Sequence, residues 1–348
     1  MMFWRVRIAR SCAGTLPSRC AMSPVEGFAY KPSSSYFNVG GRVAKTCGWV
    51  TSVATGGDRP FGVGGVVVVL VTGGSGTVGG EVVRRLPAGV EVRVLARDPA
   101  RVAAGGRVRV VRGDYGDAAS LRAALRGVRR AFLVTTVVGG DQDACFVRAA
   151  ADAGVEHVVK LSAAAVEDAG ADDLITCWQR ESEELLRSSG LAWTLLRPRS
   201  FMSNSLAWAA DIRAGGVVRE LFGASLNACV DPGDVAEVAV RALTGPGHAG
   251  RAYVLTGPEA VSAVQRTARL SCVLGRPLRF EELGWEEARA RWGRRYPPAV
   301  VEALLRSAVR QRQGAKAGVD GTFARLVGRP ARSFGQWAAD HVAGFSGR

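Results

Sequence analysis

Five glycines lie within fourteen residues in the stretch VLVTGGSGTVGGEV at 69–82. Gly73, Gly76 and Gly79 are spaced GxxGxxG, a variant of the GxGxxG fingerprint of dinucleotide-binding proteins. Gly73 would allow a sharp turn, Gly76 the approach of a pyrophosphate, and Gly79 close packing of helix on strand. The phosphates would sit at the N-terminus of the next helix, where free N–H groups favour negative charge. A glycine-rich loop without a ligand is the alternative.

The end of the second expected strand selects between two cofactors. In dinucleotide-binding folds a carboxylate at this place holds the adenosine ribose, whereas an arginine accommodates a 2′-phosphate. The chain reads ARDPAR at 96–101, so Arg97 stands where the carboxylate would be, and Arg101 is near enough to help. Asp98 competes as a signal, but it is better placed to start the turn before Pro99. The sequence therefore favours NADP(H), with NAD(H) as the alternative.

An acidic turn follows the third expected strand. The sequence GDYGD at 113–117 brings Asp114 within reach of an adenine amino group. Turn or helix capping is the alternative for Asp114, and it is the role we expect for Asp117.

Strand and helix patterns alternate from Val66 onward. The expected strands are Val66–Val71, Glu91–Ala96, Arg107–Arg112, Ala131–Thr136, His157–Ser162 and Trp193–Arg197. Helical patterns follow the glycine loop and fill Ala118–Leu125, Asp143–Ala153 and Leu174–Ser189. This alternation predicts an α/β fold with a doubly wound parallel sheet, a Rossmann fold.

The rhythm changes after Pro198, where helices and short strands predict a small C-terminal α+β lobe. Two helices there should begin at Asp231 and at the Ser262–Gln265 capping box. We therefore divide the chain into a poorly ordered extension at 1–65, a Rossmann domain at 66–200 and a substrate or partner lobe at 201–348. The lobe partly returns to the Rossmann sheet.

Composition excludes several classes of function. The extension at 1–65 carries eight basic and two acidic residues, and so supplies +6 of the net charge of +15. It resembles a transit peptide, although a translation start placed too far upstream is the interpretation that we favour.

The other arginines alternate with acids on helices, so we expect no nucleic-acid partner. No apolar run has the roughly 18–20 residues of a membrane span. Three histidines and seven cysteines lack metal-ligand spacing, which predicts free thiols, no metal and a cytoplasmic location.

A set of motifs in fixed order carries a family resemblance. They are VTGGSGTVG, ARDPAR, GDYGD, VVKLSA, SGLAWTLLRPRSFMSN, VDPGDVAEVA and LTGPEAVS. Together they resemble the NmrA-like group of atypical short-chain dehydrogenases/reductases, from about residue 66 to the C-terminus. The group includes a nitrogen-metabolite-repression regulator and NAD(P)H-dependent reductases of quinones, azo dyes and triphenylmethane dyes.

The resemblance implies a cleft between the Rossmann domain and the small lobe, above the nicotinamide. It assigns pyrophosphate contacts to Gly73, Gly76, Thr77 and Val78, and the 2′-phosphate to Arg97. It assigns adenine contacts to Asp114 and Tyr115. The strand ends would line the cofactor through Thr135, Thr136 and Ser162, and Arg197 and Pro198 would border the nicotinamide.

Catalysis is the least determined part. The best-known short-chain dehydrogenases use a Tyr-x-x-x-Lys pair as proton donor, and no such pair occurs in this sequence. Gln179 stands where reductases of the group often have a histidine, and Ser162 is the remaining candidate for a proton relay. Trp178 could stack on a planar substrate or be a buried helix residue.

Two functions therefore remain. The first is an NADPH-dependent reductase of a planar, electron-poor small molecule such as a quinone or dye, whose product water can protonate. The alternative is a non-catalytic NADP(H)-sensing regulator that binds a protein partner. The sequence leaves open the substrate, the oligomeric state, whether the chain is catalytic, and whether 1–65 belongs to the native protein.

Overall fold

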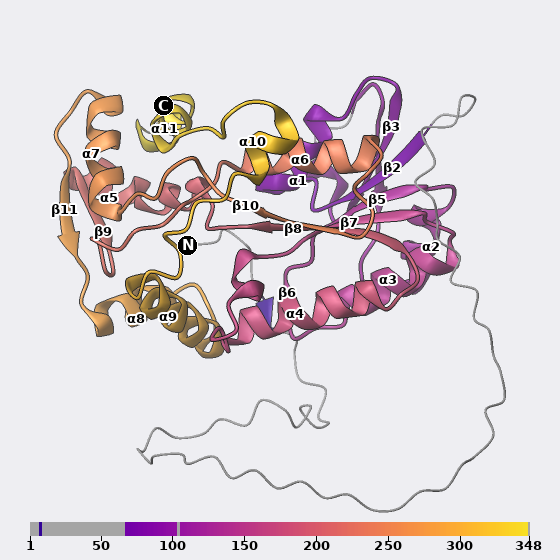
Figure 1. Ribbon diagram of the computed structural model, residues 1–348, viewed down its shortest axis with the longest axis horizontal. Helices are drawn as coiled ribbons and strands as arrows, with labels where there is room; N and C mark the ends of the chain where they lie inside the picture. The colour runs from indigo at the N-terminus through magenta and orange to yellow at the C-terminus, as the bar shows by residue number, and fades with distance from the viewer. Residues whose placement is uncertain (1–6, 9–66, 103–104, 347–348) are drawn as a thin grey trace, which may run out of the picture. The chain divides into compact units, whose positions relative to one another are not determined.

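The computed structural model describes residues 7–8, 67–102 and 105–346, which all belong to one compact unit (Figure 1). A two-residue strand, β1 (Arg7–Ile8), pairs in parallel with β6 (Val137–Val138). Apart from β1, the extension predicted at 1–65 lies outside the described residues. No helix in the described part of the chain is both long and apolar enough to cross a membrane.

Seven parallel strands form the central sheet. Their spatial order is β10 (Arg251–Leu255), β8 (Ala192–Pro198), β7 (His157–Leu161), β5 (Arg130–Leu133), β2 (Val67–Thr72), β3 (Val90–Ala96) and β4 (Val108–Arg112). The order reverses at β2, which lies between β5 and β3. Such a reversal marks the place where doubly wound proteins bind ligands, at the carboxyl ends of the strands. The predicted Rossmann fold is confirmed.

Helices cover both faces of the sheet (Figure 1). The pair α1 (Thr77–Arg85) and α6 (Pro232–Thr244) packs on one face, and α2 (Ala118–Leu125), α3 (Gln142–Asp152) and α4 (Leu174–Arg187) cover the other. Val69 and Val71 of β2 point into the core between the sheet and the α1–α6 pair, and Leu70 points into the core on the opposite face. Burial on both faces explains why this strand is apolar throughout instead of alternating.

The helix starts expected from the sequence are present. Asp117 caps α2 by accepting from Ala119 N at 2.9 Å. Asp231 caps α6 by accepting from Gly233 N at 2.7 Å. Ser262 and Gln265 form the capping box of α7 (Ala263–Leu274).

The segment after β8 supplies the smaller lobe. One part comprises η3 (Met202–Trp208), α5 (Ala209–Gly215), α7, α11 (Phe334–Asp340), α12 (Val342–Ser346) and a parallel pair of strands, β9 (Val217–Glu220) and β11 (Arg279–Glu282). A second part consists of α8 (Trp285–Gly293) and α9 (Pro298–Arg312), which enclose a core around Leu221 and Trp292.

Two elements of this segment join the Rossmann layers. Helix α6 covers one sheet face, where α10 (Thr322–Val327) packs on it, and β10 pairs with β8 at the sheet edge. Parts of the segment after β8 thus contribute to the Rossmann layers. The division at residue 200 stays a prediction, because the described residues form a single compact unit.

Candidate active site at the carboxyl edge of the sheet

The glycine loop joins β2 to α1 at the carboxyl edge of the sheet. Gly73 has a φ of +65°, a conformation that glycine adopts without strain. Its carbonyl accepts from Gly76 N at 2.8 Å. A Cβ on Gly79 would lie 2.2 Å from the Gly73 oxygen, and one on Gly74 would lie 2.5 Å from Val94 Cγ1. The loop therefore requires bare backbone at Gly79, as the spacing predicts, and also at Gly74, which the sequence analysis did not single out.

The N-terminus of α1 follows this loop directly. Gly76 is the N-cap residue, no side chain caps the helix, and its first turn contains no acidic residue. The N–H groups of Thr77, Val78 and Gly79 open the helix, at the positive end of its dipole. This arrangement fits a pyrophosphate group. It supports the predicted contacts of the loop and of Thr77 and Val78, which stay predictions.

Arg97 and Arg101 flank the turn after β3, the strand next to β2. Both side chains are exposed. Asp98 accepts from Ala100 N at 3.2 Å and caps the short 3₁₀ helix η1 (Pro99–Arg101). This is the turn role that the sequence favours for Asp98. Arg97 is exposed at the end of β3, and it stays the predicted contact for a 2′-phosphate.

The turn after β4 contains the two residues predicted to meet adenine. Asp114 is exposed, and its Oδ1 accepts from Gly116 N at 2.9 Å. Tyr115 instead points into the protein: its hydroxyl donates to the Val134 carbonyl at 2.7 Å, and its ring meets Phe146 edge-on. Burial raises the pKa of Tyr115. Its hydroxyl thus ties the turn to the end of β5 and is not an activated acid.

Thr135 and Thr136 lie beyond β5 rather than in it, so the predicted strand is too long. The strand ends at Leu133 because Val134 N donates at 2.7 Å to the side-chain oxygen of Thr72, instead of continuing the ladder. Thr136 is half-buried, and its N–H donates to the Gln142 side chain at 3.2 Å.

Thr135 contacts a buried ion pair, Lys160–Asp143, which the sequence alone did not indicate. Lys160 Nζ lies 2.7 Å from Asp143 Oδ1, and both side chains are buried. The Thr135 hydroxyl donates to the same carboxylate at 3.1 Å. The ring of Trp178 covers the pair, with its centroid 5.9 Å from Nζ. This cluster fixes the loop after β5, and the Thr135 side chain is directed into the protein.

Ser162 follows β7 directly, and its hydroxyl already has a hydrogen-bond partner. It donates to Glu183 Oε1 at 2.5 Å, and both side chains are buried. The geometry therefore favours a structural hydroxyl over a proton relay at Ser162. Its assignment as a catalytic or cofactor-binding residue stays a prediction.

The Glu183 carboxylate forms ion pairs with two arginines. Arg197 NH2 lies 2.5 Å from Glu183 Oε2, and Arg187 NH2 lies 2.9 Å from the same oxygen. Burial opposes ionisation of Glu183, but hydrogen bonds from Arg197 and Ser162 and the charges of both arginines outweigh it. They hold the pKa of this carboxyl below its ordinary value. Arg197, predicted to border the nicotinamide, also pairs with Glu167 at 2.7 Å.

Gln179 and Trp178 both lie on the buried side of α4. Gln179 is 1% exposed and its Oε1 has no hydrogen-bond partner in the described part of the chain. Trp178 is 5% exposed, so its ring is a buried helix residue and not a stacking surface. The assignment of Gln179 as a catalytic residue stays a prediction.

A pocket of about 170 Å³ opens at the carboxyl ends of β7 and β8, against α9. Its apolar walls include Ala163–Ala165, Leu221, Val300 and Leu304. Of the site residues expected from the sequence, only Pro198 lines it. In the described residues no group of three or more His, Cys, Asp or Glu side chains could hold a metal ion.

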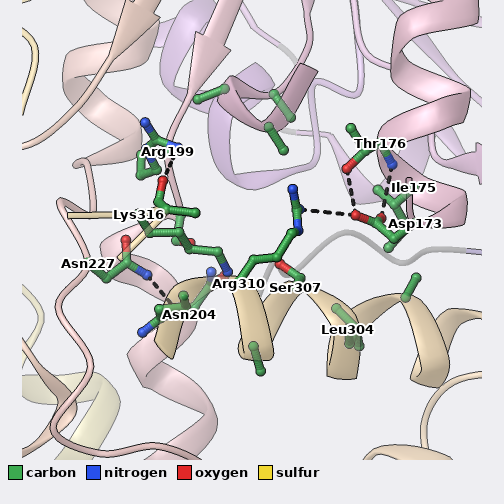
Figure 2. Close-up of a pocket in the computed structure, with 18 of the residues that line it drawn as sticks. Asp173, Ile175, Thr176, Arg199, Asn204, Asn227, Leu304, Ser307, Arg310 and Lys316 are labelled. Carbon is green, nitrogen blue, oxygen red and sulfur yellow. Dashed lines mark hydrogen bonds and ion pairs between the residues drawn. The ribbon is translucent and has the colours of Figure 1, made fainter. Parts of the chain in front are cut away.

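Cations, carboxylates, amides and hydroxyls together form the polar part of the pocket lining (Figure 2). Arg310 reaches from α9 to Asp168 at 2.7 Å and to Asp173 at 3.1 Å. Arg199 donates to the Ala315 carbonyl at 3.2 Å, and burial lowers its pKa. Burial and the charges of Arg310 and Arg199 lower the pKa of Lys316 to about 8.

Two signals in the sequence could have located this pocket. Arg199 follows the Arg197–Pro198 end of β8 and belongs to a motif of the family resemblance. Lys316 is one of four lysines in a chain that otherwise uses arginine. Nothing in the sequence places the loop at 313–320 beside β8, because that contact joins distant segments.

Comparisons with known proteins agree with this geometry. Residues 73–246 match the family described as NAD(P)H-binding. A (4-alkanoyl-5-oxo-2,5-dihydrofuran-3-yl)methyl phosphate reductase from Streptomyces griseus is 56% identical over 280 residues, 80% of this chain and 99% of that protein. An NAD(P)H azoreductase from Xenophilus azovorans is 37% identical over 287 residues, with coverages of 80% and 99%.

A solved structure extends the likeness to the cofactor. The NADPH complex of an NADPH-dependent quinone oxidoreductase from Escherichia coli superposes with a TM-score of 0.69 at 27% identity, covering 79% of this chain and 99% of that one. The expected NADP(H) cofactor and the expected oxidoreductase class are confirmed. The chain belongs to the NAD(P)H-binding, NmrA-like group of atypical short-chain dehydrogenases/reductases and is an oxidoreductase.

Proposed function

We propose that this oxidoreductase uses NADPH to reduce a planar, electron-poor ring, at a carbon–carbon double bond conjugated to carbonyl groups. The observation that carries the proposal is the pocket beside Pro198, at the same sheet edge as the glycine loop. Its walls combine apolar side chains with four cations and three carboxylates, and the cations suit a flat ring that bears carbonyl or anionic oxygens.

The proton chemistry favours such a substrate. The sequence has no Tyr-x-x-x-Lys pair. The pocket does contain Tyr296, but burial raises its pKa, the opposite of the activation that a lysine gives in that pair. A substrate whose hydride adduct is a stabilised anion needs no strong protein acid, since water can protonate it. Quinones and doubly activated alkenes meet this requirement, and a cationic dye gives a neutral adduct that needs no proton at all.

The relative from Streptomyces griseus narrows the choice among these. The compound in its name contains a ring double bond between a carbon bearing a phosphorylated methyl group and a carbon bearing an acyl group. The ring carbon that bears the acyl group is also bonded to the ring carbonyl carbon, so two carbonyl groups activate the double bond. At 56% identity over nearly the whole of that protein, we infer the same reducible group for this chain.

The reaction balances without a further reactant. Bound NADPH supplies a hydride, which would add to the ring carbon distal to the carbonyls. The electron pair of the double bond moves into the dicarbonyl system, and a proton from water completes the saturated product. The residues of this chain would bind and orient: the glycine loop holds the cofactor, and the pocket walls hold the ring and limit access of water.

An NADP(H)-sensing regulator is the second candidate. A filled cleft and an exposed apolar patch would favour it. The pocket is open instead, and the large exposed apolar side chains of the described region are four residues on separate segments: Leu174, Leu226, Val264 and Val319. These observations favour the reductase.

The test is NADPH consumption by the purified chain with four acceptors: an acylbutenolide methyl phosphate, its free alcohol, a naphthoquinone and an azo dye. Saturation of the butenolide double bond, identified by mass spectrometry, is the expected result. Tight NADPH binding by calorimetry with no turnover of any acceptor would favour the regulator.

A further inference from the structure

Three cations that line the pocket, Arg199, Arg266 and Lys316, have no carboxylate partner in the described part of the chain. Neither Arg199 nor Lys316 forms an ion pair with any residue that the structure describes, although ion pairs are common there. Arg199 donates only to a backbone carbonyl, and its Nε has no hydrogen-bond partner within the same residues. Both side chains are partly buried. Partly buried charges of one sign are costly unless a counter-ion meets them.

The other cations of the pocket are engaged. Arg310 is held between two carboxylates, Asp168 and Asp173. Arg266 donates to the Ser205 hydroxyl at 3.1 Å, and its guanidinium stacks over Trp208 at 4.7 Å from the ring centroid. Arg266 has no carboxylate partner among the described residues, but a hydroxyl and an aromatic face already contact its guanidinium, so Arg199 and Lys316 are the cations that an anion could still meet.

Nearby acids do not cancel this charge. Asp173 and Glu220 favour the protonated form of Lys316, but burial and the charges of Arg310 and Arg199 outweigh them. Asp173 is committed to capping α4, through Thr176, and to Arg310. Glu220 accepts from the Trp208 indole at 3.1 Å. An anion entering beside Lys316 would find donors that no protein carboxylate uses.

We propose that Arg199 and Lys316 form a subsite for the phosphate monoester of the substrate. This inference rests on the proposed function for the rest of the substrate. Arg199 follows β8 directly, at the carboxyl edge where the ring would sit, and Lys316 closes the pocket from the loop after α9 (Figure 2). A phosphate offers three acceptor oxygens, enough for both donors, whereas quinones and dyes without an anionic group would leave the pair unmet.

The arrangement also assigns a role to the Arg310 cluster. Arg310 bonds both Asp168 and Asp173, so these carboxylates already have a cationic partner, and the contacts link α9 to the start of α4. Arg310 is thus a positioning residue, and Arg199 and Lys316 are the specificity-determining ones. The apolar walls are left for the ring and its acyl chain.

The first experiment compares Arg199→Met, Lys316→Met and the double variant with the parent, using the butenolide methyl phosphate and its alcohol. We expect each single variant to raise KM for the phosphate ester by about tenfold to a hundredfold, the worth of one charge-assisted contact. KM for the alcohol and Kd for NADPH should stay within about twofold. Arg306→Met is the matched control, because it removes a cation from α9 whose partner, Asp172, is exposed.

Equal effects on ester and alcohol would overturn the subsite. A loss confined to NADPH binding would overturn it too, because it would place the two cations at the cofactor. Melting temperatures check the fold, and Lys316→Gln serves as second variant if Lys316→Met fails to fold.

A second experiment separates this inference from the proposed function. Methyl phosphate is titrated calorimetrically into the protein saturated with NADP⁺. Binding by the parent and by Arg306→Met, but not by the double variant, supports the subsite even where no acceptor is reduced. Equal binding by all three proteins, or none by the parent, contradicts it.

Discussion

The carbonyl oxygen of Gly73 occupies the space that a side chain on Gly79 would need, since a Cβ there would lie 2.2 Å from it. Real Cβ contacts are not this short, and the neighbour is backbone, so the loop itself would have to move. Gly79→Ala is therefore expected to destabilise the fold by about 1–3 kcal/mol and to weaken NADPH binding at least tenfold. Gly89→Ala is the control, because a Cβ there meets nothing within 4 Å. Unchanged NADPH affinity of Gly79→Ala in calorimetry would contradict the pyrophosphate assignment.

Cofactor choice should depend on Arg97. A charge-assisted contact to the 2′-phosphate contributes about 1.5–3 kcal/mol, so Arg97→Ala should weaken NADPH about tenfold to a hundredfold and leave NADH within twofold. Arg97→Asp should invert the preference, because its carboxylate repels the phosphate and can accept from the ribose hydroxyls. Arg101→Ala should show a smaller loss. The measurement is the ratio of the two dissociation constants, and a ratio unchanged in Arg97→Ala would remove this residue from the site.

Ser162→Ala distinguishes a structural from a catalytic hydroxyl. The variant leaves buried Glu183 one donor short, so the free energy of unfolding should fall by about 1–3 kcal/mol. Turnover and the pH dependence of kcat should not change. Ser188→Ala is the control, since that hydroxyl bonds the Glu184 carbonyl on the exposed side of α4. A fall in kcat with altered pH dependence would restore Ser162 as a proton relay.

Glu183 should make stability depend on pH in the acid range. Its folded pKa is lowered, so its contribution is fully present above the unfolded value of about 4.3 and is lost as pH falls through the folded value. Glu183→Gln leaves Arg197 and Arg187 without this partner and should cost about 3–5 kcal/mol at neutral pH. The difference from the parent should shrink at about pH 3. Urea unfolding at both pH values measures the free energies of unfolding. A difference between variant and parent that does not change with pH would contradict the stabilising role of the Glu183 ion pairs.

The phosphate subsite predicts an alkaline limit to turnover of phosphorylated substrate. Lys316 faces Arg199, Arg310, Asp173 and Glu220, and its pKa in the free protein is about 8. The ester is a dianion above about pH 6, so kcat/KM should be level near pH 7, fall to about half by pH 8 and decrease further above it, as Lys316 loses its proton. The free alcohol should lack this fall, as should Lys316→Met. A parent profile that is the same for ester and alcohol would contradict the role of Lys316.

The sequence predicted the parts of this fold whose cause is local. The strands of the predicted Rossmann sheet are short segments that are either apolar throughout or alternate apolar with polar residues, and the caps at Asp117, Asp231 and Ser262 depend on neighbours only a few positions away. The glycine loop is local too, because its geometry follows from residues 73 to 79. Strand ends were less accurate: β5 stops early because Thr72, on another strand, takes the next N–H.

The candidate site was predictable only in part, because its chemistry depends on distant pairings. The Lys160–Asp143 pair and the Ser162–Glu183 bond join residues about twenty positions apart, and burial decides which polar groups must meet. The pocket joins the end of β8 to a loop more than a hundred residues later. Periodicity contains no information about such contacts, so Ser162 and Gln179 stood out by type while Arg199 and Lys316 did not.

The pairing of β10 with β8 has a consequence for how this protein can be cut or rearranged. A fragment ending near residue 200 would keep the glycine loop, but it would lose α6 from one sheet face and would leave β8 as an unpaired edge. Exposed edges of this kind invite association with other chains. The nucleotide-binding half is therefore not a transplantable module, and an exchange of substrate lobes between relatives would have to retain α6 and β10 as part of the recipient sheet.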